Sequence, residues 1–178
     1  MNNELILRPI RAEEAVEAKR LIYAVAHALM EPQMTLEEVT ALWDSWGVFS
    51  DMDDVQKNYF ENGGVFWVTV DGGQIVGTGA FQRDAEREGV CEVRRIALLP
   101  EYRGRGAGYA MMMELMRRAR DMGYIKMSLW TNRYKLVRAV IFYQQLGFVE
   151  VSHAGADEDE IWMELEIDPP VGSDQRPA

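Results

Sequence analysis

The feature that most constrains this chain is a glycine-rich turn at residues 103–108, Arg-Gly-Arg-Gly-Ala-Gly. It follows a β-rich run at 90–98 and leads directly into residues 109–122, whose apolar positions recur at helical spacing. Such a turn at the start of a helix presents backbone N–H groups and the positive end of the helix dipole, which together bind phosphate. Because Arg103 and Arg105 add positive charge, we expect an anion site here.

Two better-known phosphate loops do not match this turn. The sequence has no Gly-Lys-Ser/Thr ending, and its glycines lack the Gly-x-Gly-x-x-Gly spacing of dinucleotide-binding folds. The next β-rich run ends in Trp130-Thr131-Asn132 rather than in a carboxylate that would bind a ribose. The plain alternative is a tight strand-to-helix turn with solvated arginines. Three glycines and two arginines within six residues favour the phosphate-binding interpretation.

The pattern of apolar residues predicts one α/β domain over residues 1–168. Two β-rich runs flank Asp71-Gly72-Gly73 and predict a hairpin, and the second half of the chain alternates strand and helix. The expected strands are 5–7, 66–70, 74–81, 90–98, 125–130, 148–151 and 161–167, and the expected helices are 13–30, 35–46, 109–122 and 137–146. Residues 169–178 carry little apolar material, and we expect a disordered tail there.

Composition excludes several other classes of protein. Apolar residues make up 48% of the 178 residues and charged residues 27%, which is typical of a globular chain. The single cysteine, Cys91, excludes an intrachain disulfide framework, and no apolar stretch reaches the ~18 residues of a membrane span. A net charge of −10 argues against nucleic acid and anionic membranes as partners. We expect a cytoplasmic protein with a local anion site in its arginine-rich middle segment.

Two motifs resemble those of the GCN5-related N-acetyltransferases, the GNAT family. The acetyl-coenzyme A signature of that family, Arg or Gln followed by x-x-Gly-x-Gly or Ala, is matched at residues 103–108. Residues 139–148, Ala-Val-Ile-Phe-Tyr-Gln-Gln-Leu-Gly-Phe, are similar to the late helix of the family and its Tyr-x-x-x-Gly-Phe ending. The resemblance covers residues 66–151, and two motifs at the right separation are more specific than the turn alone.

This resemblance implies a fold and an acyl donor. The fold is α/β, a mixed, mostly antiparallel seven-stranded sheet splayed between strands 4 and 5, with flanking helices. The donor is acetyl-coenzyme A (acetyl-CoA), with its pantetheine arm in the splay. The coenzyme-binding residues implied are Ile96, Ala97 and Leu98 for the pantetheine and acetyl carbonyl, Arg103, Gly104, Arg105, Gly106, Ala107 and Gly108 for the pyrophosphate, and Asn132 for the arm. The family often carries a bulge in the fourth strand, so alternation alone does not fix the direction of Glu92 or Arg94.

The resemblance also implies catalytic residues. Tyr143 matches a tyrosine whose hydroxyl lies near the coenzyme sulfur as general acid, and the alternative is a tyrosine packed in the core. Glu92 occupies the place of a carboxylate that faces the acceptor in several relatives, and we expect it to be the base. Its alternatives are an ion pair with Arg94 or Arg83, or a substrate contact while water removes the amine proton. Cys91 is expected to be a buried apolar residue, a covalent acetyl-enzyme being the alternative, and no metal site is expected.

The acceptor implied is a primary amine. Trp43, Trp46 and Tyr59 lie in the segment that forms much of the acceptor wall in the family, and they either line that wall or pack a helix. The acidic net charge favours a small cationic or amino-acid-like acceptor. The alternatives are a protein or peptide amine, a catalytically silent acyl-CoA-binding sensor, and a dinucleotide-binding oxidoreductase. The late strands offer a surface for a homodimer.

Overall fold

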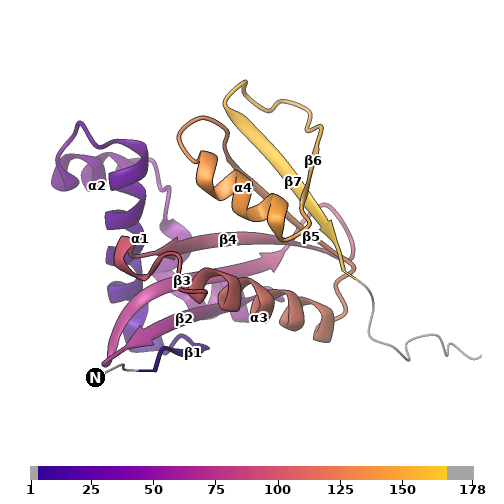
Figure 1. Cartoon of the computed structure of the whole chain (residues 1–178), viewed down its shortest axis with the longest axis horizontal. Helices are drawn as coiled ribbons and strands as arrows, with labels where there is room; N and C mark the ends of the chain where they lie inside the picture. Colours follow the sequence, from indigo (N-terminus) through magenta and orange to yellow (C-terminus); the bar gives the residue numbers. More distant parts are fainter. Residues whose placement is uncertain (1–3, 168–178) are drawn as a thin grey trace, which may run out of the picture.

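The computed structural model describes residues 4–167, which form a seven-stranded sheet with helices on both faces (Figure 1). The strands are β1 (Ile6–Pro9), β2 (Val65–Asp71), β3 (Gln74–Arg83), β4 (Val90–Leu98), β5 (Lys126–Asn132), β6 (Val149–Val151) and β7 (Glu160–Glu166). The helices are α1 (Ala15–Met30), α2 (Leu36–Ser45), α3 (Ala107–Asp121) and α4 (Val137–Gln145). Short helical turns are η1 (Ala12–Glu14), η2 (Ser50–Asp54), η3 (Gln56–Phe60) and η4 (Pro100–Tyr102). Residue 168 and the tail expected at 169–178 lie outside the described residues.

The sheet has the strand order β1-β2-β3-β4-β5-β7-β6. All neighbouring strands are antiparallel except β4 and β5, which are parallel. The connection between these two strands is α3, as expected for a parallel pair, which needs a crossover. The predicted fold class, a mixed and mostly antiparallel seven-stranded sheet with flanking helices, is therefore confirmed.

The two halves of the sheet separate between β4 and β5. These strands pair at only three positions, Val90 with Lys126, Cys91 with Met127 and Glu92 with Ser128. Beyond them β4 continues beside β3, whereas β5 turns away together with β6 and β7 (Figure 1). The splay expected between strands 4 and 5 is thus present, and it leaves the carboxyl ends of both strands without each other as partners.

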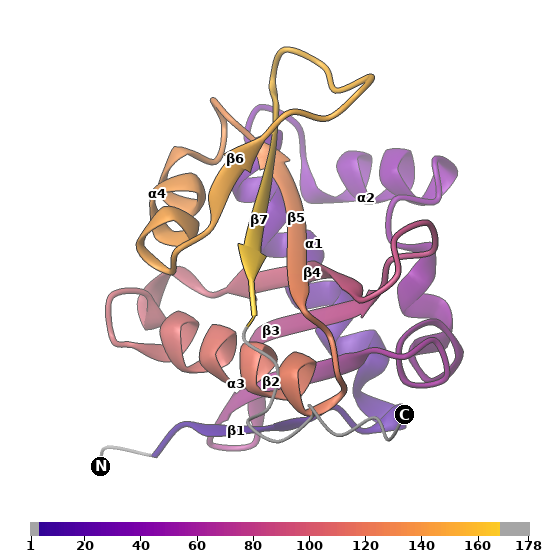
Figure 2. The ribbon, with the colours of Figure 1, turned by 90° about the vertical axis from the view of Figure 1, so that its right-hand side faces the viewer.

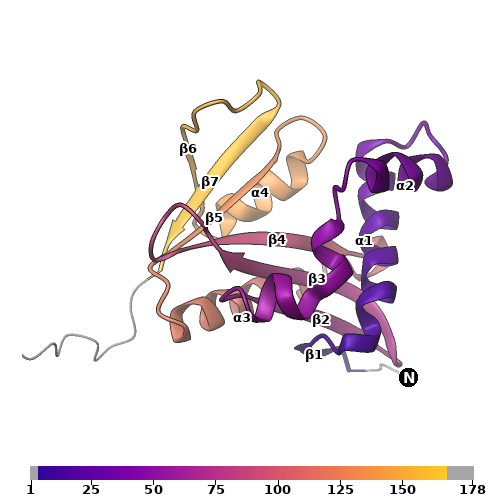
Figure 3. The same cartoon turned by 180° about the vertical axis from the view of Figure 1, so that it is seen from behind.

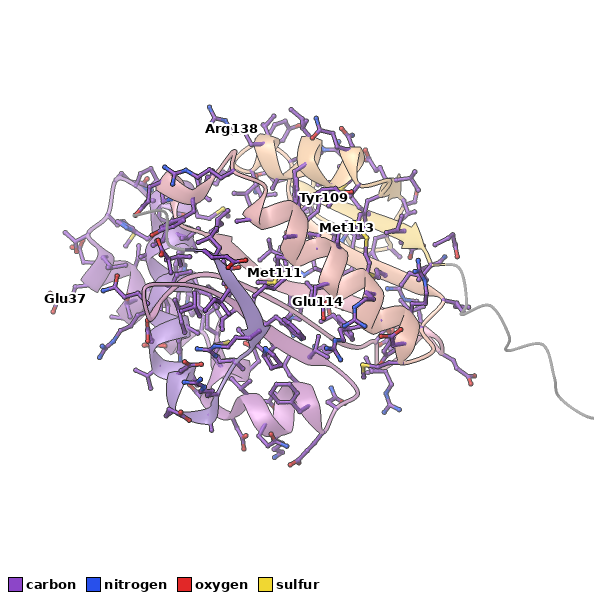
Figure 4. The ribbon with its side chains drawn as sticks, turned by 60° about the horizontal axis from the view of Figure 1, so that its bottom comes forward. Glu37, Tyr109, Met111, Met113, Glu114 and Arg138 are labelled. Atoms are coloured by element: carbon purple, nitrogen blue, oxygen red, sulfur yellow. The ribbon has the colours of Figure 1, made fainter. Side chains whose placement is uncertain are left out.

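Different helices cover the two faces of the sheet. The core on one face joins α1, α2 and the η2–η3 segment to β2, β3 and β4, and Figure 3 shows these helices on the side opposite α3. The core on the other face lies under α3 and α4, with α3 along the β2–β3 half and α4 along the half formed by β5, β6 and β7 (Figure 2). On α3, Met111 points to the sheet, whereas Tyr109 and Met113 lie toward α4 and are 57% and 43% exposed (Figure 4).

Local chemistry explains several boundaries of these elements. Thr35 caps α2, since its hydroxyl accepts the N–H of Glu38 while the Glu38 carboxylate accepts the N–H of Thr35 at 2.9 Å. Gly72 and Gly73 form the turn of the β2–β3 hairpin with φ of 55° and 90°, values that residues with a Cβ rarely adopt. The predicted hairpin is confirmed by the pairing of β2 with β3.

The segment between α2 and β2 differs most from expectation. No helix was predicted for residues 50–60, yet they form η2 and η3, and Met52, Val55 and Tyr59 recur at helical spacing. Its order comes from tertiary packing, with Met52, Val55 and Tyr59 buried in the core beside α1. Within residues 4–167, no helix combines the length and the hydropathy that crossing a membrane requires.

Candidate active site

A cleft of about 290 Å³ lies where β4 and β5 diverge. Side chains of α1 and Phe49 line one side, side chains of α4 line the other, and β4 and β5 lie between them. Of the predicted site residues, Glu92, Ile96, Ala97 and Tyr143 line this cleft. Because the strands separate here, groups that belong to opposite faces of the sheet reach the same space.

Tyr143 reaches the cleft from α4 and is also packed in the core. It is 8% exposed, and its ring lies 5.8 Å from that of Phe148 and 5.6 Å from that of Phe142, measured between centroids. Burial raises the pKa of its hydroxyl above the ordinary tyrosine value. The hydroxyl is therefore protonated at neutral pH, as a general acid must be, and the two interpretations made from the sequence are compatible.

Glu92 and Arg94 enter the cleft from β4. They lie opposite Gln82 and Ala80 of β3, and Ala80 belongs to the core under α1, which places both side chains on the α1 face. The Glu92 Oε1 and Arg94 Nε atoms are 3.8 Å apart, an ion pair but too long for a hydrogen bond. With 23% and 29% of their side chains exposed, both groups can still bind a ligand.

A bulge in β4 directly follows Arg94. The β3–β4 register shifts between Thr78 and Ala80, and Arg95 has a φ of 58°, the one positive value for a non-glycine residue within residues 4–167. The Thr78 hydroxyl donates to the Arg95 carbonyl at 2.7 Å. Arg95 and Ile96 have no register partner on β3, so the regular ladder of β4 is interrupted at the mouth of the splay.

The side chain of Arg95 ties the bulge to the η2 segment. Its Nε donates to an Asp51 carboxylate oxygen at 2.9 Å, its Nη2 donates to the other oxygen and to the Val48 carbonyl at 2.9 Å, and its guanidinium lies 4.6 Å from the Phe49 ring centroid. Burial raises the pKa of Asp51, but the hydrogen bond and charge of Arg95 and the hydrogen bond from Tyr59 outweigh it, and the pKa is lowered. This buried pair holds Phe49 at the wall of the cleft.

The glycine-rich turn adjoins the same cleft. Gly104 and Gly106 have φ of 72° and 84°, and the space that a Cβ would occupy at each is open. Gly106 is the N-cap of α3, whose first N–H groups have no partner within the helix. At Gly108 an added Cβ would lie 3.7 Å from Phe142, a residue of the cleft wall, so the start of α3 lies beside the cleft, while Arg105, Gly106 and Ala107 line a separate pocket.

Two hydrogen bonds hold the turn to the sheet. The Tyr102 hydroxyl donates to Asp71 at the end of β2 at 2.8 Å, and the Arg103 Nε donates to the Leu98 carbonyl at 3.1 Å. Arg105 lies over the Tyr102 ring, 5.9 Å from its centroid. Tyr102 and Arg103 therefore anchor the turn to the sheet, while Gly104 and Gly106 face open space.

The remaining predicted coenzyme residue, Asn132, ends β5. Its side-chain oxygen accepts the N–H groups of Tyr134 and Lys135 at 3.0 and 2.7 Å and shapes the turn before α4. Contact of Asn132 with the coenzyme arm stays a prediction. Asn132, Leu98 and the glycine-rich turn border the cleft at the ends of β5 and β4 and do not line it.

The aromatic residues considered for the acceptor wall do not line this cleft. Trp43 and Tyr59 are buried in the core, and Trp46 is 67% exposed. Phe49 lines the cleft instead, together with Ile22 on α1. The sequence carries no signal for Phe49, because its position depends on the distant Arg95.

Cys91 is a poor candidate for a covalent acetyl-enzyme. It is fully buried in β4, and burial raises the pKa of its thiol, whereas attack needs the thiolate. Within the part of the chain that the structure describes, no group of three or more His, Cys, Asp or Glu side chains could hold a metal ion.

The splayed sheet, the glycine-rich turn at the start of α3 and the cleft between β4 and β5 are features of an acyl-CoA-dependent acyltransferase fold. The model of the family described as "Acetyltransferase (GNAT) family" matches residues 19–148. This chain belongs to that family, which confirms the resemblance.

Known relatives agree with this assignment. The chain is 30% identical over 105 residues to the uncharacterized N-acetyltransferase YjgM of Escherichia coli (strain K12), covering 58% of this chain and 62% of that protein. It is 34% identical over 113 residues to N-acetylaspartate synthetase of Xenopus tropicalis, covering 63% of this chain and 40% of that protein. The chain thus spans about half the length of the curated relatives it matches.

A solved structure shares the fold. The PaiA N-acetyltransferase from Thermoplasma acidophilum, in complex with coenzyme A, matches with a TM-score of 0.73 and 17% identity, over 92% of this chain and 99% of that one. At this identity the likeness shows the fold alone.

Proposed function

We propose that this chain transfers the acetyl group of acetyl-CoA to the primary amine of a small, amino-acid-like molecule. The observation that carries the proposal is that Tyr143 and Glu92, from opposite faces of the sheet, line one cleft that adjoins the glycine-rich turn. Membership of the acetyltransferase family and a fold neighbour that contains coenzyme A support it.

The residues of the cleft and the turn fit acetyl-CoA. Open space at Gly104 and Gly106, with the free N–H groups at the start of α3, suits a pyrophosphate, and Arg105 adds positive charge. The edge of β4 beyond Glu92, which has no register partner on β5, suits the amide groups of a pantetheine arm.

The proposed reaction is direct transfer. The amine nitrogen attacks the thioester carbonyl carbon, a C–N bond forms, and the C–S bond breaks. Glu92 accepts the proton that the amine loses, and the Tyr143 hydroxyl gives its proton to the leaving sulfur, so the net proton movement is from nitrogen to sulfur. Backbone N–H groups at the β4 bulge, where Arg95 and Ile96 have no register partner on β3, stabilise the developing oxyanion.

The role of Glu92 is tested by the pH dependence of turnover. If it is the base, Glu92→Gln lowers kcat/KM by about 100-fold and removes the ionisation that limits the wild-type rate at low pH. A Glu92→Gln profile of unchanged height and position shows instead that water removes the proton.

Three acidic residues between α1 and β2, Asp44, Asp51 and Asp53, do not favour binding of a polycation in the cleft, because each is paired with a basic side chain. Asp51 is paired with Arg95, and Asp44 and Asp53 lie 3.6 and 2.7 Å from Lys19 Nζ. Of the two acceptor types predicted from the sequence, we therefore propose the amino-acid-like one. The name of N-acetylaspartate synthetase, a relative, refers to an acetylated amino acid and supports this choice.

The first experiment measures thiol release from acetyl-CoA with amino acids, polyamines, aminoglycosides and short peptides, against a reaction without amine. We expect release with amino acids. Release with peptides alone points to a protein acceptor. No release with any amine, while acetyl-CoA still raises Tm as a ligand of the native state must, indicates a sensor.

A further inference from the structure

We propose that Arg94 is the carboxylate anchor of the acceptor site and that the acceptor is an α-amino acid with an apolar side chain. The inference rests on the proposed function and extends it to substrate class. Glu92 and Arg94 carry opposite charges, two residues apart on one face of β4, with 3.8 Å between Oε1 and Nε. An α-amino acid carries its amine and its carboxylate on one carbon, so a carboxylate and a guanidinium this close can bind both.

Arg94 is free for this task, whereas Arg95 is not. Arg95 is committed to Asp51, Val48 and Phe49, and its side chain is 11% exposed. Arg94 has one ion-pair contact within residues 4–167, the long one to Glu92, and its side chain is 29% exposed in the cleft. A guanidinium binds a carboxylate through two parallel N–H···O bonds, which fix the orientation of the ligand as well as its charge.

The walls on this side of the cleft are apolar. Ile22, Val25 and Leu29 present one edge of α1 to the cleft. Trp130 of β5 also lines the cleft and is 48% exposed. It lies on the same face of β5 as Ser128, the register partner of Glu92. A ligand held by Glu92 and Arg94 therefore places its side chain between α1 and Trp130, where an apolar group is favoured over a charged one.

The same groups discriminate against other amines. Glu92 is the one acid among the described residues that line the cleft, and Arg94 repels a second positive charge on the acceptor. A dicarboxylic amino acid places its extra carboxylate against apolar walls. Both polyamines and acidic amino acids are thus expected to be poor acceptors.

Matched acceptors test the carboxylate directly. L-phenylalanine is compared with 2-phenylethylamine, and L-leucine with 3-methylbutylamine, by kcat/KM for thiol release. We expect each amino acid to exceed its amine by about 100-fold, the size of a charge-assisted bidentate contact. L-aspartate and spermidine are expected to fall below L-phenylalanine by at least about tenfold.

Variants assign the effect to Arg94. Arg94→Met should lower kcat/KM for the amino acids by about 100-fold and that for the amines far less, and Arg94→Lys should lower kcat/KM for the amino acids less than Arg94→Met does. Arg20→Met, an exposed arginine on α1 outside the cleft, is the matched control and should change neither rate. Tm of each variant shows that it is folded.

Each other outcome overturns the inference. Equal rates for amino acids and their amines, or an Arg94→Met variant that loses both alike, exclude a carboxylate anchor. Faster transfer to L-aspartate than to L-leucine excludes the apolar subsite. If thiol release occurs with amines but depends neither on an acceptor carboxylate nor on an apolar side chain, this inference is overturned and the proposed function stands. No thiol release with any amine overturns both.

Discussion

At the scale of single residues, Arg94 and Arg95 show how neighbouring identical side chains acquire different tasks. The left-handed backbone at Arg95 costs about 1–2 kcal/mol. Its hydrogen bonds to Asp51 and the Val48 carbonyl offset this cost. Arg94 and Glu92 precede the bulge at Arg95, and their regular pairing with Ala80 and Gln82 places them in the cleft on the α1 face.

The Tyr143 hydroxyl carries the proton for the leaving sulfur in the proposed reaction. We expect Tyr143→Phe to lower kcat by about 100-fold with little change in KM for acetyl-CoA, because the ring keeps its packing on Phe148. Initial rates of thiol release at saturating substrate measure this. Tyr134→Phe, at a tyrosine that is 66% exposed, is the control, and full turnover by Tyr143→Phe would exclude the general acid.

A substitution at Gly106 tests whether the glycine-rich turn binds the pyrophosphate, because an added Cβ there meets no neighbouring atom. Gly106 and Gly123 have φ of 84° and 85° and open surroundings, at the start and the end of α3. Alanine at either position should cost about 1 kcal/mol of stability, measured by urea unfolding. Only Gly106→Ala should also weaken acetyl-CoA binding, by about tenfold in Kd by calorimetry, and equal affinity of the two variants would contradict the assignment.

At the scale of elements, the β4 bulge and the η2 segment form one unit. The buried Arg95–Asp51 pair joins them, and the Tyr59 hydroxyl also donates to Asp51. Phe49 between them lines the cleft, so the acceptor wall depends on a contact between residues 44 positions apart in sequence.

Breaking this pair should be costly. Arg95→Met leaves the Asp51 carboxylate buried without its cation, and we expect the free energy of unfolding to fall by about 3 kcal/mol. Urea denaturation followed by circular dichroism measures it. Arg117→Met removes two ion pairs on the surface of α3, to Glu114 and Asp121, and should cost far less; an equal cost would show that the Arg95 pair is not part of the core.

The sequence predicted the elements whose signals are local. The periodicity of α3 and α4, the hairpin at Gly72 and Gly73, and the turn before α3 all depend on neighbouring residues, and the structure contains each of them. The role of Phe49 depends on the distant Arg95, and the direction of Arg94 depends on the register of β4 against β3. No local pattern encodes such contacts, which is why this wall of the site was not predicted.

At the scale of the whole molecule, two half-sheets meet through three residue pairs of β4 and β5. The cleft lies in this junction, lined by side chains of α1 and α4. A ligand that contacts both strands binds the folded state alone and therefore stabilises the whole chain.

Several paired carboxyl groups should make the fold acid-sensitive. The hydrogen bond from Arg8 lowers the pKa of Glu14 to about 2, and the pKa of Asp51 is also lowered. A carboxyl group whose pKa is lowered by folding stabilises the protein above its unfolded pKa, and this contribution is lost as pH falls through the folded value. We expect the free energy of unfolding to decline from about pH 4.5 toward pH 2.

Urea unfolding between pH 7 and pH 3 measures this decline. Glu14→Gln should reduce its slope, whereas Gln at the exposed Glu13 should leave it unchanged. A slope that is identical in all three proteins would show that the Arg8–Glu14 pair does not contribute to acid sensitivity.

The most direct test of direct transfer is mass spectrometry of a reaction with acetyl-CoA that carries deuterium in its acetyl group and L-phenylalanine as acceptor. The account predicts that one labelled acetyl group appears on the amine for each free thiol formed. Labelled acetate with unmodified amine, or label bound covalently to the protein, would contradict it.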